Sequence, residues 1–423
     1  MADNRSFTLT FLGDVMLGRI VDQLFPQHVH NLREQHIAAH FIEQYPSLLG
    51  PGHYTPSSPW GTTLPLLQSS DLTLINLETS ATTTSEPWPD KTFNYRMHPA
   101  NLGPILHAAN VDYASLANNH VLDFGAEGLV ETAWTLRDAG IAFAGAGETT
   151  NQAFKPAVLS LPRQTHPERI HGQGRETPSH HQQSYPVHVY SATDHPRAWS
   201  AIPTFHLIDY SPRTRVRLRQ LLLSNGTTTH PPVSPGEEPL HPDSFAHESH
   251  DFHHRAHHHH HHQQIAAQRA PALKIFSIHW GPNYEWHPAD RIRALAHFLI
   301  DECEVDIVHG HSSHHIQGVE KYKGKLIIYG CGDFVDDYAL NEEFRNDLGA
   351  VWRVTVQERG GGLALDRLEI FPTRIDRFRA LLLDSGERDH GLVRARVSRL
   401  SAEMGTSVNG ELGEDGQIIF DLR

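Results

Sequence analysis

The sequence predicts a layered α/β protein, and three observations support that fold class. Short apolar runs rich in β-branched residues recur along the chain, which is typical of strands buried in a parallel sheet. Residues 289–303 space their apolar side chains for one buried helical face, and another apolar run follows within a few residues. This βαβ pattern predicts two parallel strands joined by a right-handed crossover. Finally, the apolar runs end at residues of one chemical kind.

Six apolar runs stop at residues that can hold a metal ion. The runs are 7–12, 72–75, 111–116, 275–278, 305–308 and 326–329. The polar residues beyond them include Asp14, Glu78, Asn118, Asn119, His120, His279, His309, His311, His314 and Asp333. In layered α/β folds, ligands bind just beyond the carboxyl ends of the strands. Six strand ends with this chemistry therefore predict one converging site.

The other elements follow from the same periodicities. The expected helices are 101–109, 126–139 with Gly140 as its C-cap, 213–223 and 391–404. Further strands are expected near 187–190, 351–356, 363–371 and 418–420, the second and third in an antiparallel region. Loops rich in Pro, Ser and Thr are expected at 45–65 and 79–89. We divide the chain into an N-terminal half, an insertion, a C-terminal half and a tail packing on the core, with bounds 6–160, 161–270, 271–385 and 386–423.

Two polar stretches interrupt these patterns. Residues 163–184 and 225–268 are rich in His, Gln, Pro and Gly, and an unbroken histidine run occupies 257–262. Such segments bury too little apolar area to offset the entropy of ordering, so we expect disordered or loosely held inserts around a short structured island. A histidine run can bind Zn²⁺ or Ni²⁺ weakly, but solvated low complexity is the preferred interpretation. These histidines are left out of the expected site.

The composition excludes several classes of protein. Lys and Arg total 35 against 49 for Asp and Glu, which argues against nucleic-acid binding because that function needs a basic face. Two cysteines in 423 residues exclude a disulfide scaffold. No apolar stretch approaches the roughly 18 residues that span a bilayer, and the N-terminus lacks a signal-peptide pattern. We therefore expect a cytoplasmic protein without a membrane span.

The donor set at the strand ends indicates a divalent metal. Oxygen and imidazole ligands are expected from Asp14, Glu78, Asn119, His279, His311 and His314. This set suits one or two ions of Mn, Fe or Zn, and it lacks the thiolates of a structural zinc site. Glu78 is the expected bridge if two ions lie about 3.5–4 Å apart. His120 would lie beside the metal and protonate a leaving group or stabilise negative charge.

Each of these residues also has a structural alternative. Asp14 could cap a helix starting near Leu17, and Asn118 and Asn119 could be turn residues. His120 could be a hydrogen-bonded core histidine, and His279 could simply pack at a strand end. The histidines between 309 and 315 are harder to dismiss, because several imidazoles are costly to bury without partners.

Six motifs give the chain a family resemblance. They are FLGDVMLGR at 11–19, INLE at 75–78, ANNHVLDFG at 117–125, HWGPNYE at 279–285, GHSSHHIQG at 310–318 and YGCGDF at 329–334. These motifs resemble the CapA family of capsule-synthesis and poly-γ-glutamate proteins, which have a calcineurin-like metallophosphatase fold. The resemblance covers residues 6–160 and 270–385. It implies a four-layer α/β/β/α sandwich with its site at the strand ends.

The resemblance also implies roles for individual residues. Asp14 resembles the first aspartate ligand, Glu78 the bridging carboxylate, Asn119 a ligand and His120 the acid. His279 matches the histidine before Trp-Gly, and His311 and His314 match the final pair, for which His309 or His315 could substitute. Met16 stands where a metallophosphatase has a second histidine, which would leave one metal short of a ligand. Residues expected to orient ligands or contact substrate are Arg19, Asn118, Asp123, His309, His315 and Asp333.

Two functions are consistent with this sequence. The first is a metal-dependent hydrolase in which an activated water attacks a phosphoester or a γ-glutamyl amide. Arg19, Arg96 and Lys91 could bind its anionic substrate, although Lys91 is better interpreted as a solvated surface charge. The second is a non-catalytic, metal-containing scaffold that binds an anionic polymer or a synthase partner. The oligomeric state is left open.

Overall fold

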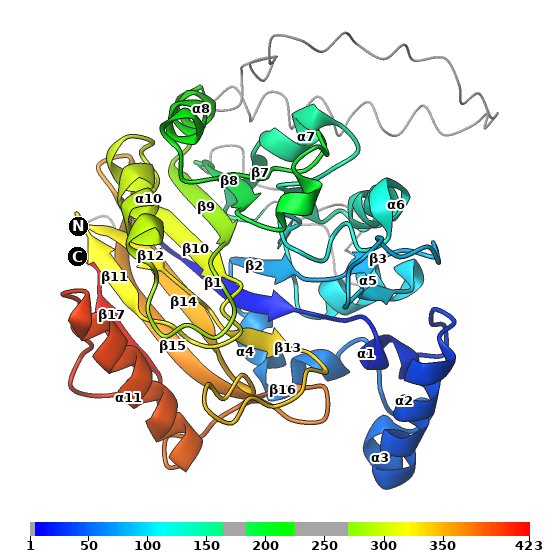
Figure 1. Cartoon of the computed structure of the whole chain (residues 1–423). Helices are drawn as coiled ribbons and strands as arrows, with labels where there is room; N and C mark the ends of the chain where they lie inside the picture. The colour runs from blue at the N-terminus through cyan, green and yellow to red at the C-terminus, as the bar shows by residue number, and fades with distance from the viewer. Residues whose placement is uncertain (1–4, 164–182, 225–269) are drawn as a thin grey trace, which may run out of the picture.

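The computed structural model describes residues 5–163, 183–224 and 270–423 (Figure 1). The two polar stretches predicted to be disordered lie almost wholly outside these residues, so that expectation stays a prediction. Among the described residues, no helix combines the length and apolar character needed to cross a membrane.

One large sheet holds the first of the predicted strand ends. Its main path runs β16 (Ala380–Leu382), β15 (Gly362–Ile375), β14 (Leu348–Arg359), β1 (Ser6–Val15), β2 (Leu72–Leu77), β5 (Tyr113–Ser115) and β6 (Ala142–Ala144). Two shorter strands join it, β13 (Asp333–Val335) beside β1 and β17 (Ile418–Asp421) beside β15. The strands β1, β2, β5 and β6 are parallel to one another, whereas β14 and β15 are antiparallel to their neighbours, as predicted.

A second sheet holds the other strand ends. Its order is β11 (Val319–Tyr322), β12 (Lys325–Ile328), β10 (Ile307–His311), β9 (Leu273–His279), β8 (Tyr185–Thr193) and β7 (Ala157–Leu161). The strands β8, β9, β10 and β12 are parallel. Helix α10 (Asp290–Asp301) connects β9 to β10. The apolar face that the sequence predicts for it is buried, and its residues are Ile292, Leu295, Ala296, Leu299 and Ile300. The predicted βαβ unit is therefore confirmed.

Helices and short elements surround the two sheets (Figure 1). The predicted helices correspond to α5 (Pro99–Ala108), α6 (Gly125–Asp138), α8 (Pro212–Leu223) and α11 (Arg388–Glu403). The remaining elements are α1 (Ile20–Gln23), α2 (Leu32–Gln44), α3 (Pro46–Leu49), η1 (Ser58–Thr63), α4 (Leu64–Gln68), β3 (Ser80–Ala81), β4 (Arg96–Met97), α7 (Thr150–Phe154) and η3 (Arg197–Trp199). The expected loop at 45–65 therefore contains short helices.

Three apolar clusters hold the layers together. One combines residues from both sheets, among them Phe11 and Trp352 of the first sheet and Val187 and Ile275 of the second. A second cluster joins the opposite face of the first sheet to α5 and α6. A third joins the opposite face of the second sheet to α8 and α10. Both faces of each sheet are therefore covered by apolar side chains.

Two sequence expectations need comment. Asp14 lies inside β1, and the next helix begins only at Ile20 with Arg19 as its N-cap, so the alternative that Asp14 caps a helix is wrong. Strand β8 comes from the structured island of the expected insertion, and it lies between β7 and β9 within the second sheet. The proposed division into 6–160, 161–270, 271–385 and 386–423 stays a prediction.

Candidate metal centre

Parallel strands deliver the candidate ligands to one place. Asp14 is the penultimate residue of β1, and Glu78 directly follows β2. His279 and His311 are the last residues of β9 and β10, and the two lie in register on adjacent strands. The carboxyl ends of parallel strands lie at the same edge of a sheet, which explains why residues far apart in sequence converge.

The turn after β10 and the strand β13 complete the arrangement. His314 adopts a left-handed backbone conformation with φ of 58°. Its Nδ1 lies 2.8 Å from Asp333 Oδ1 and 3.6 Å from Asp14 Oδ2. Asp333 begins β13, which pairs with β1 so that Asp333 and Asp14 are in register. Both halves of the chain thus contribute to the site.

Two groups of side chains can each hold an ion. One group is Asp14, His279 and His311, and the other is Asp14, Glu78, His314 and Asp333. Within each group, one potential ligand atom per residue lies within 4.8 Å of all the others. Every member is buried, and Asp14 belongs to both groups.

Unpartnered buried atoms show that these residues fit a cation. Among the described residues, these atoms have no hydrogen-bond partner: Asp14 Oδ2, both Glu78 carboxylate oxygens, Asn119 Oδ1, His279 Nε2 and Asp333 Oδ2. Buried polar atoms without partners are rare in folded proteins, because their desolvation is not compensated. A divalent ion would compensate those that belong to the two groups, namely the atoms of Asp14, Glu78, His279 and Asp333. Oxygen and imidazole donors suit Mn, Fe or Zn.

The electrostatics of the site without a cation are unfavourable. Burial and then the charge of Asp14 raise the pKa values of Glu78 and Asp333 well above their usual range. Burial also raises the pKa of Asp14, against the opposing effect of His314. Burial lowers the pKa values of His279 and His311 well below the ordinary value of 6.5. A bound cation would reverse the effect on the carboxylates, because it stabilises their charged forms.

His120 is held beside this cluster by three contacts. Its Nδ1 lies 2.7 Å from Asp123 Oδ2 and 3.1 Å from Lys91 Nζ. Its ring stacks on Tyr95 with a centroid separation of 3.9 Å. Asp123 is fixed in turn, because it also accepts hydrogen bonds from Lys91 and from the backbone N–H of Tyr95. Burial lowers the pKa of His120 to about 4.

A chain of amides connects Asp14, a candidate metal ligand, to His120. Asn76 Nδ2 donates to Asp14 Oδ1 at 2.7 Å, and Asn118 Nδ2 donates to Asn76 Oδ1 at 3.0 Å. Asn118 Oδ1 then accepts the backbone N–H of His120 at 3.0 Å. The sequence analysis placed Asn118 correctly near the ligands but did not single out Asn76.

Two expected histidines lie outside both groups. His309 Nε2 is 2.8 Å from the backbone oxygen of Leu12, and its Nδ1 is 3.0 Å from Ser277 Oγ. His315 packs against Trp286 with a ring separation of 4.8 Å. Neither residue belongs to a ligand group, although the ring of His309 lies 5.2 Å from that of His311, so the substitution of either for His311 or His314 stays a prediction.

The sequence analysis missed the pair Asp194–His195. The ring of His195 lies 5.1 Å from that of His279, and its Nδ1 contacts Asp194 Oδ1. Asp194 Oδ2 is held by the hydroxyl of Tyr210 at 2.6 Å and by the backbone N–H of Gly281 at 3.0 Å. The pair directly follows β8, so the strand-end pattern used for the other residues could have identified it.

The three basic residues proposed to bind substrate are already engaged. Arg19 Nε lies 3.3 Å from Asp337, and the guanidinium lies 5.2 Å from the centroid of the Tyr95 ring. Arg96 donates to backbone oxygens, including that of His30 at 3.3 Å. Lys91 is largely buried against Asp123 and is not a solvated surface charge, which corrects the preferred interpretation.

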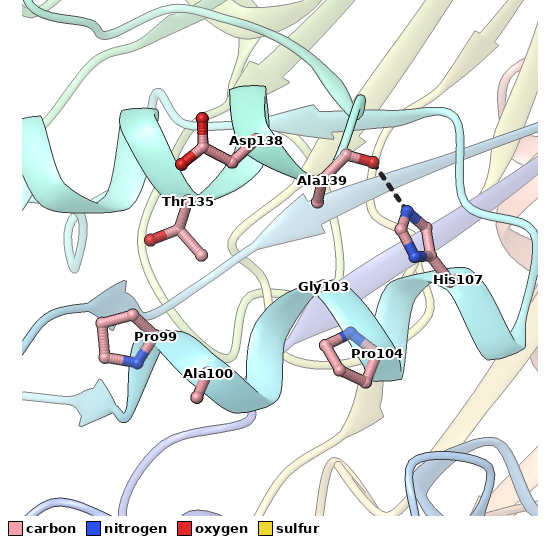
Figure 2. Close-up of a pocket in the computed structure, with 8 residues that line it drawn as sticks. All are labelled: Pro99, Ala100, Gly103, Pro104, His107, Thr135, Asp138 and Ala139. Atoms are coloured by element: carbon pink, nitrogen blue, oxygen red, sulfur yellow. Dashed lines mark hydrogen bonds between the residues drawn. The ribbon is translucent and has the colours of Figure 1, made fainter. Parts of the chain in front are cut away.

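A groove elsewhere on the molecule lacks comparable chemistry. It encloses about 360 Å³ between α5 and α6, and Pro99, Gly103 and Pro104 form much of its lining. Figure 2 shows the ring of His107 turned to the backbone oxygen of Ala139, 2.6 Å away. Its lining does not bring together the carboxylates and imidazoles seen at the strand ends.

Comparisons with known proteins agree with the sequence motifs. Residues 8–338 match the family model described as bacterial capsule synthesis protein PGA_cap. A probable polyglutamine synthesis accessory protein of Mycobacterium tuberculosis is 32% identical, over 96% of this chain and 95% of the relative. The PGA biosynthesis protein CapA of Bacillus subtilis is 22% identical, over 78% of this chain and 63% of the relative. The expected resemblance is thereby confirmed, and the chain belongs to the bacterial capsule synthesis protein PGA_cap family.

Proposed function

We propose that this chain is a metal-dependent hydrolase that cleaves a phosphoester or a γ-glutamyl amide in poly-γ-glutamate or capsule metabolism. One observation carries the proposal: unpartnered, buried ligand atoms gather at the strand ends beside His120, whose ring is held by Asp123. The names of the relatives, which refer to polyglutamine synthesis and PGA biosynthesis, support the substrate class.

We also propose that the two sheets and their helices form the four-layer α/β/β/α sandwich of the metallophosphatases. The three apolar clusters support this arrangement, because one joins the two sheets and the others join each sheet to its own helices. The position of the ligands at the carboxyl ends of parallel strands is consistent with the same fold.

The bound cations would supply Lewis acidity and would lower the pKa of a water molecule. Side chains of the protein would carry out the proton transfer. His120 Nε2 accepts a proton from the attacking water and passes it to the leaving oxygen or nitrogen, so no net proton stays on the ring. Asp123 holds Nδ1 and stabilises the charged imidazole during the transfer.

Basic side chains at the site would orient an anionic substrate. The guanidinium of Arg19 lies over Tyr95, which in turn stacks on His120, so Arg19 is close to the reacting groups. Its Nε faces Asp337, whose side chain is buried, and the guanidinium also contacts Tyr95; its other N–H groups would donate to a carboxylate or phosphate of the substrate. This contact would place the substrate between Arg19 and the metal ligands.

Reconstitution with metal tests the proposal. Purified full-length protein is stripped with a chelator, reloaded with Mn²⁺, Fe²⁺ or Zn²⁺, and assayed on a phosphodiester and on γ-glutamyl oligomers. We expect turnover on one substrate class only in the reloaded protein. His120→Ala should abolish that turnover while the metal content stays unchanged. Turnover that survives full removal of metal would contradict the proposal.

A non-catalytic scaffold is the second candidate, and one observation favours it. Met16 is fully buried where a metallophosphatase has a histidine ligand, so the resemblance leaves one ion short of a ligand. Such a protein would bind an anionic polymer or a synthase partner at the same site. The reconstitution experiment separates the two: metal-loaded protein that binds γ-glutamyl oligomers but turns over neither substrate class is a scaffold.

A further inference from the structure

Asp333 begins β13, the strand that pairs with the end of β1. From the sequence we expect it to orient a histidine. One of its oxygens does contact His314 Nδ1, at 2.8 Å. The other oxygen, Oδ2, is buried and makes no hydrogen bond of ordinary geometry among the described residues, although the carboxyl group also faces the side chains of Asp14, Asp336 and Asn346. A residue that only orients His314 needs the first oxygen alone. The second oxygen therefore requires another explanation.

We propose that Asp333 is itself a metal ligand, and that it compensates for the histidine that Met16 replaces. It would hold one ion together with Asp14, Glu78 and His314, whereas His279 and His311 would hold the other ion with Asp14. Asp14, the residue common to both groups, would then be the bridging carboxylate in place of Glu78. This inference rests on the proposed metal-dependent function, because it names the ligands of that centre.

The backbone explains why Asp333 can take this place. Strand β13 pairs in parallel with β1, and the registered residues are Asp333 and Asp14. Adjacent strands lie only about 4.8 Å apart, so side chains of registered residues on the same face are neighbours. The backbone N–H of Asp14 donates to the oxygen of Gly332 at 3.2 Å, which fixes the two strands at this point.

The local charges point the same way. Asp14, Glu78 and Asp333 are all buried, and each offers a carboxylate oxygen within 4.8 Å of the others. Three carboxylates that share one enclosed volume are costly unless a cation neutralises them. His314, the imidazole in contact with Asp333 and Asp14, supplies at most one positive charge. A divalent ion supplies the remainder.

Asp333→Asn separates ligation from orientation. The asparagine keeps the size of the side chain and one oxygen that can accept the hydrogen bond from His314. It places an amide NH₂ where Oδ2 stands, and an amide nitrogen of this kind does not ligate a metal. An orienting residue would therefore tolerate the change, whereas a ligand would not.

Counting ions gives a readout that does not need enzyme activity. The experiment uses full-length protein in which the six histidines at 257–262 are changed to glutamine, so that the run binds no ion. After reloading with Mn²⁺, mass spectrometry counts the ions and electron paramagnetic resonance detects exchange coupling between neighbouring Mn²⁺ ions. We expect two coupled ions in the wild-type site and one uncoupled ion in Asp333→Asn.

Two further variants keep the result interpretable. His279→Ala should also retain one ion, but in the group that contains Asp333, so the double variant with Asp333→Asn should retain none. Asp366→Asn is the control: Asp366 is a buried carboxylate on β15, and it belongs to neither group. It should keep both ions. Circular dichroism and unfolding curves verify that each variant folds.

Each alternative result has a distinct meaning. Two ions in folded Asp333→Asn, a single ion in the wild type, or loss of an ion in Asp366→Asn would overturn the role of Asp333. A wild-type protein that binds no Mn²⁺, Fe²⁺ or Zn²⁺ would instead contradict the proposed function itself.

Discussion

At the scale of single residues, three imidazole rings in or beside the candidate site each contact a carboxylate through Nδ1. Asp123 holds His120, Asp194 holds His195, and Asp333 contacts His314. A carboxylate behind an imidazole fixes the orientation of the ring and the position of its proton. The site is therefore built from carboxylate–imidazole pairs as well as from ligands.

Asp123→Asn tests the pair that contains the proposed acid–base residue. The amide cannot accept from both Lys91 and His120 as the carboxylate does, and it cannot stabilise a charged ring. We expect kcat to fall by about 10- to 100-fold with KM and metal content nearly unchanged. Steady-state kinetics and metal analysis measure both quantities. Asp138→Asn, an exposed carboxylate on α6, is the control, and equal losses in the two variants would contradict the role of Asp123.

Sequence reasoning identified strand ends that the structure brings close together, but it could not choose among neighbouring histidines. The strand-end pattern correctly brought Asp14, Glu78, His279 and His311 together. It could not exclude His315, because the direction of that ring depends on the left-handed turn at His314, which no periodicity reveals. The unpartnered oxygen of Asp333 is likewise a property of packing and not of the residue type.

At the scale of elements, the close approach of β1 and β13 positions the ligands. A Cβ on Gly13 would lie 1.7 Å from the backbone oxygen of Gly332, so only glycine permits this approach. The fold class and most strands were predictable because both faces of each sheet are apolar. The pairing of β13 with β1 was not, because three residues of short strand carry no usable period.

Gly13→Ala should separate these two strands. We expect the free energy of unfolding to fall by about 3 kcal/mol or more, since backbone must move to accept the methyl group. Urea unfolding measures the change, and metal affinity should fall with it because Asp14 and Asp333 move apart. Gly386→Ala is the control, since its Cβ would meet nothing within 4 Å, and its effect should stay within about 0.5 kcal/mol. Equal stability of Gly13→Ala and the wild type would refute the requirement.

Strand β8 carries a buried histidine that predicts an acid-sensitive fold. Both ring nitrogens of His188 lack partners among the described residues, and burial followed by the charge of Lys274 lowers its pKa to about 4. The unfolded chain binds a proton at this residue below its ordinary pKa of 6.5, whereas the folded chain does not. The free energy of unfolding therefore falls as the pH decreases from 6.5 towards 4, and it is unaffected above that window.

His188→Leu should remove this contribution. Leucine does not titrate. Within the window, the free energy of unfolding of the variant should therefore fall less steeply with decreasing pH than that of the wild type, by up to about 1.4 kcal/mol per pH unit. At pH 7.5 it should be at least as stable as the wild type, because no unpartnered ring nitrogen remains buried. Urea unfolding between pH 7.5 and 4.5 measures both effects, with the exposed His107→Leu as control. A slope identical to that of the wild type would show that His188 is not responsible.

At the scale of the whole molecule, the ligands come from both sheets, so metal binding should stabilise the fold globally. Strands β1 and β2 belong to the first sheet, whereas β9 and β10 belong to the second. An ion that binds only when both are in place stabilises the folded state by mass action. The cluster between the sheets and the metal centre at their edge would then unfold together.

Chelation should expose this coupling. In protein with the 257–262 histidines changed to glutamine, we expect Mn²⁺ at 100 times its Kd to stabilise the fold by about 2.7 kcal/mol over the chelated form. Chemical unfolding monitored by circular dichroism measures the difference. Asp14→Asn should respond much less, since Asp14 belongs to both ligand groups. An identical response in Asp14→Asn and the wild type would place the stabilising ion elsewhere.

The strands β8, β9 and β10 end in register with one another, and this register limits how the site can change during evolution. Thr193 lies opposite His279, and His279 lies opposite His311. Side chains alternate between faces along a strand, so adding or deleting one residue within β9 would turn His279 towards the opposite side. Substitutions can be tolerated along these strands wherever volume is kept, whereas changes of length cannot. Insertions in descendants of this gene should therefore accumulate in the connections and spare the strands that end at the imidazoles.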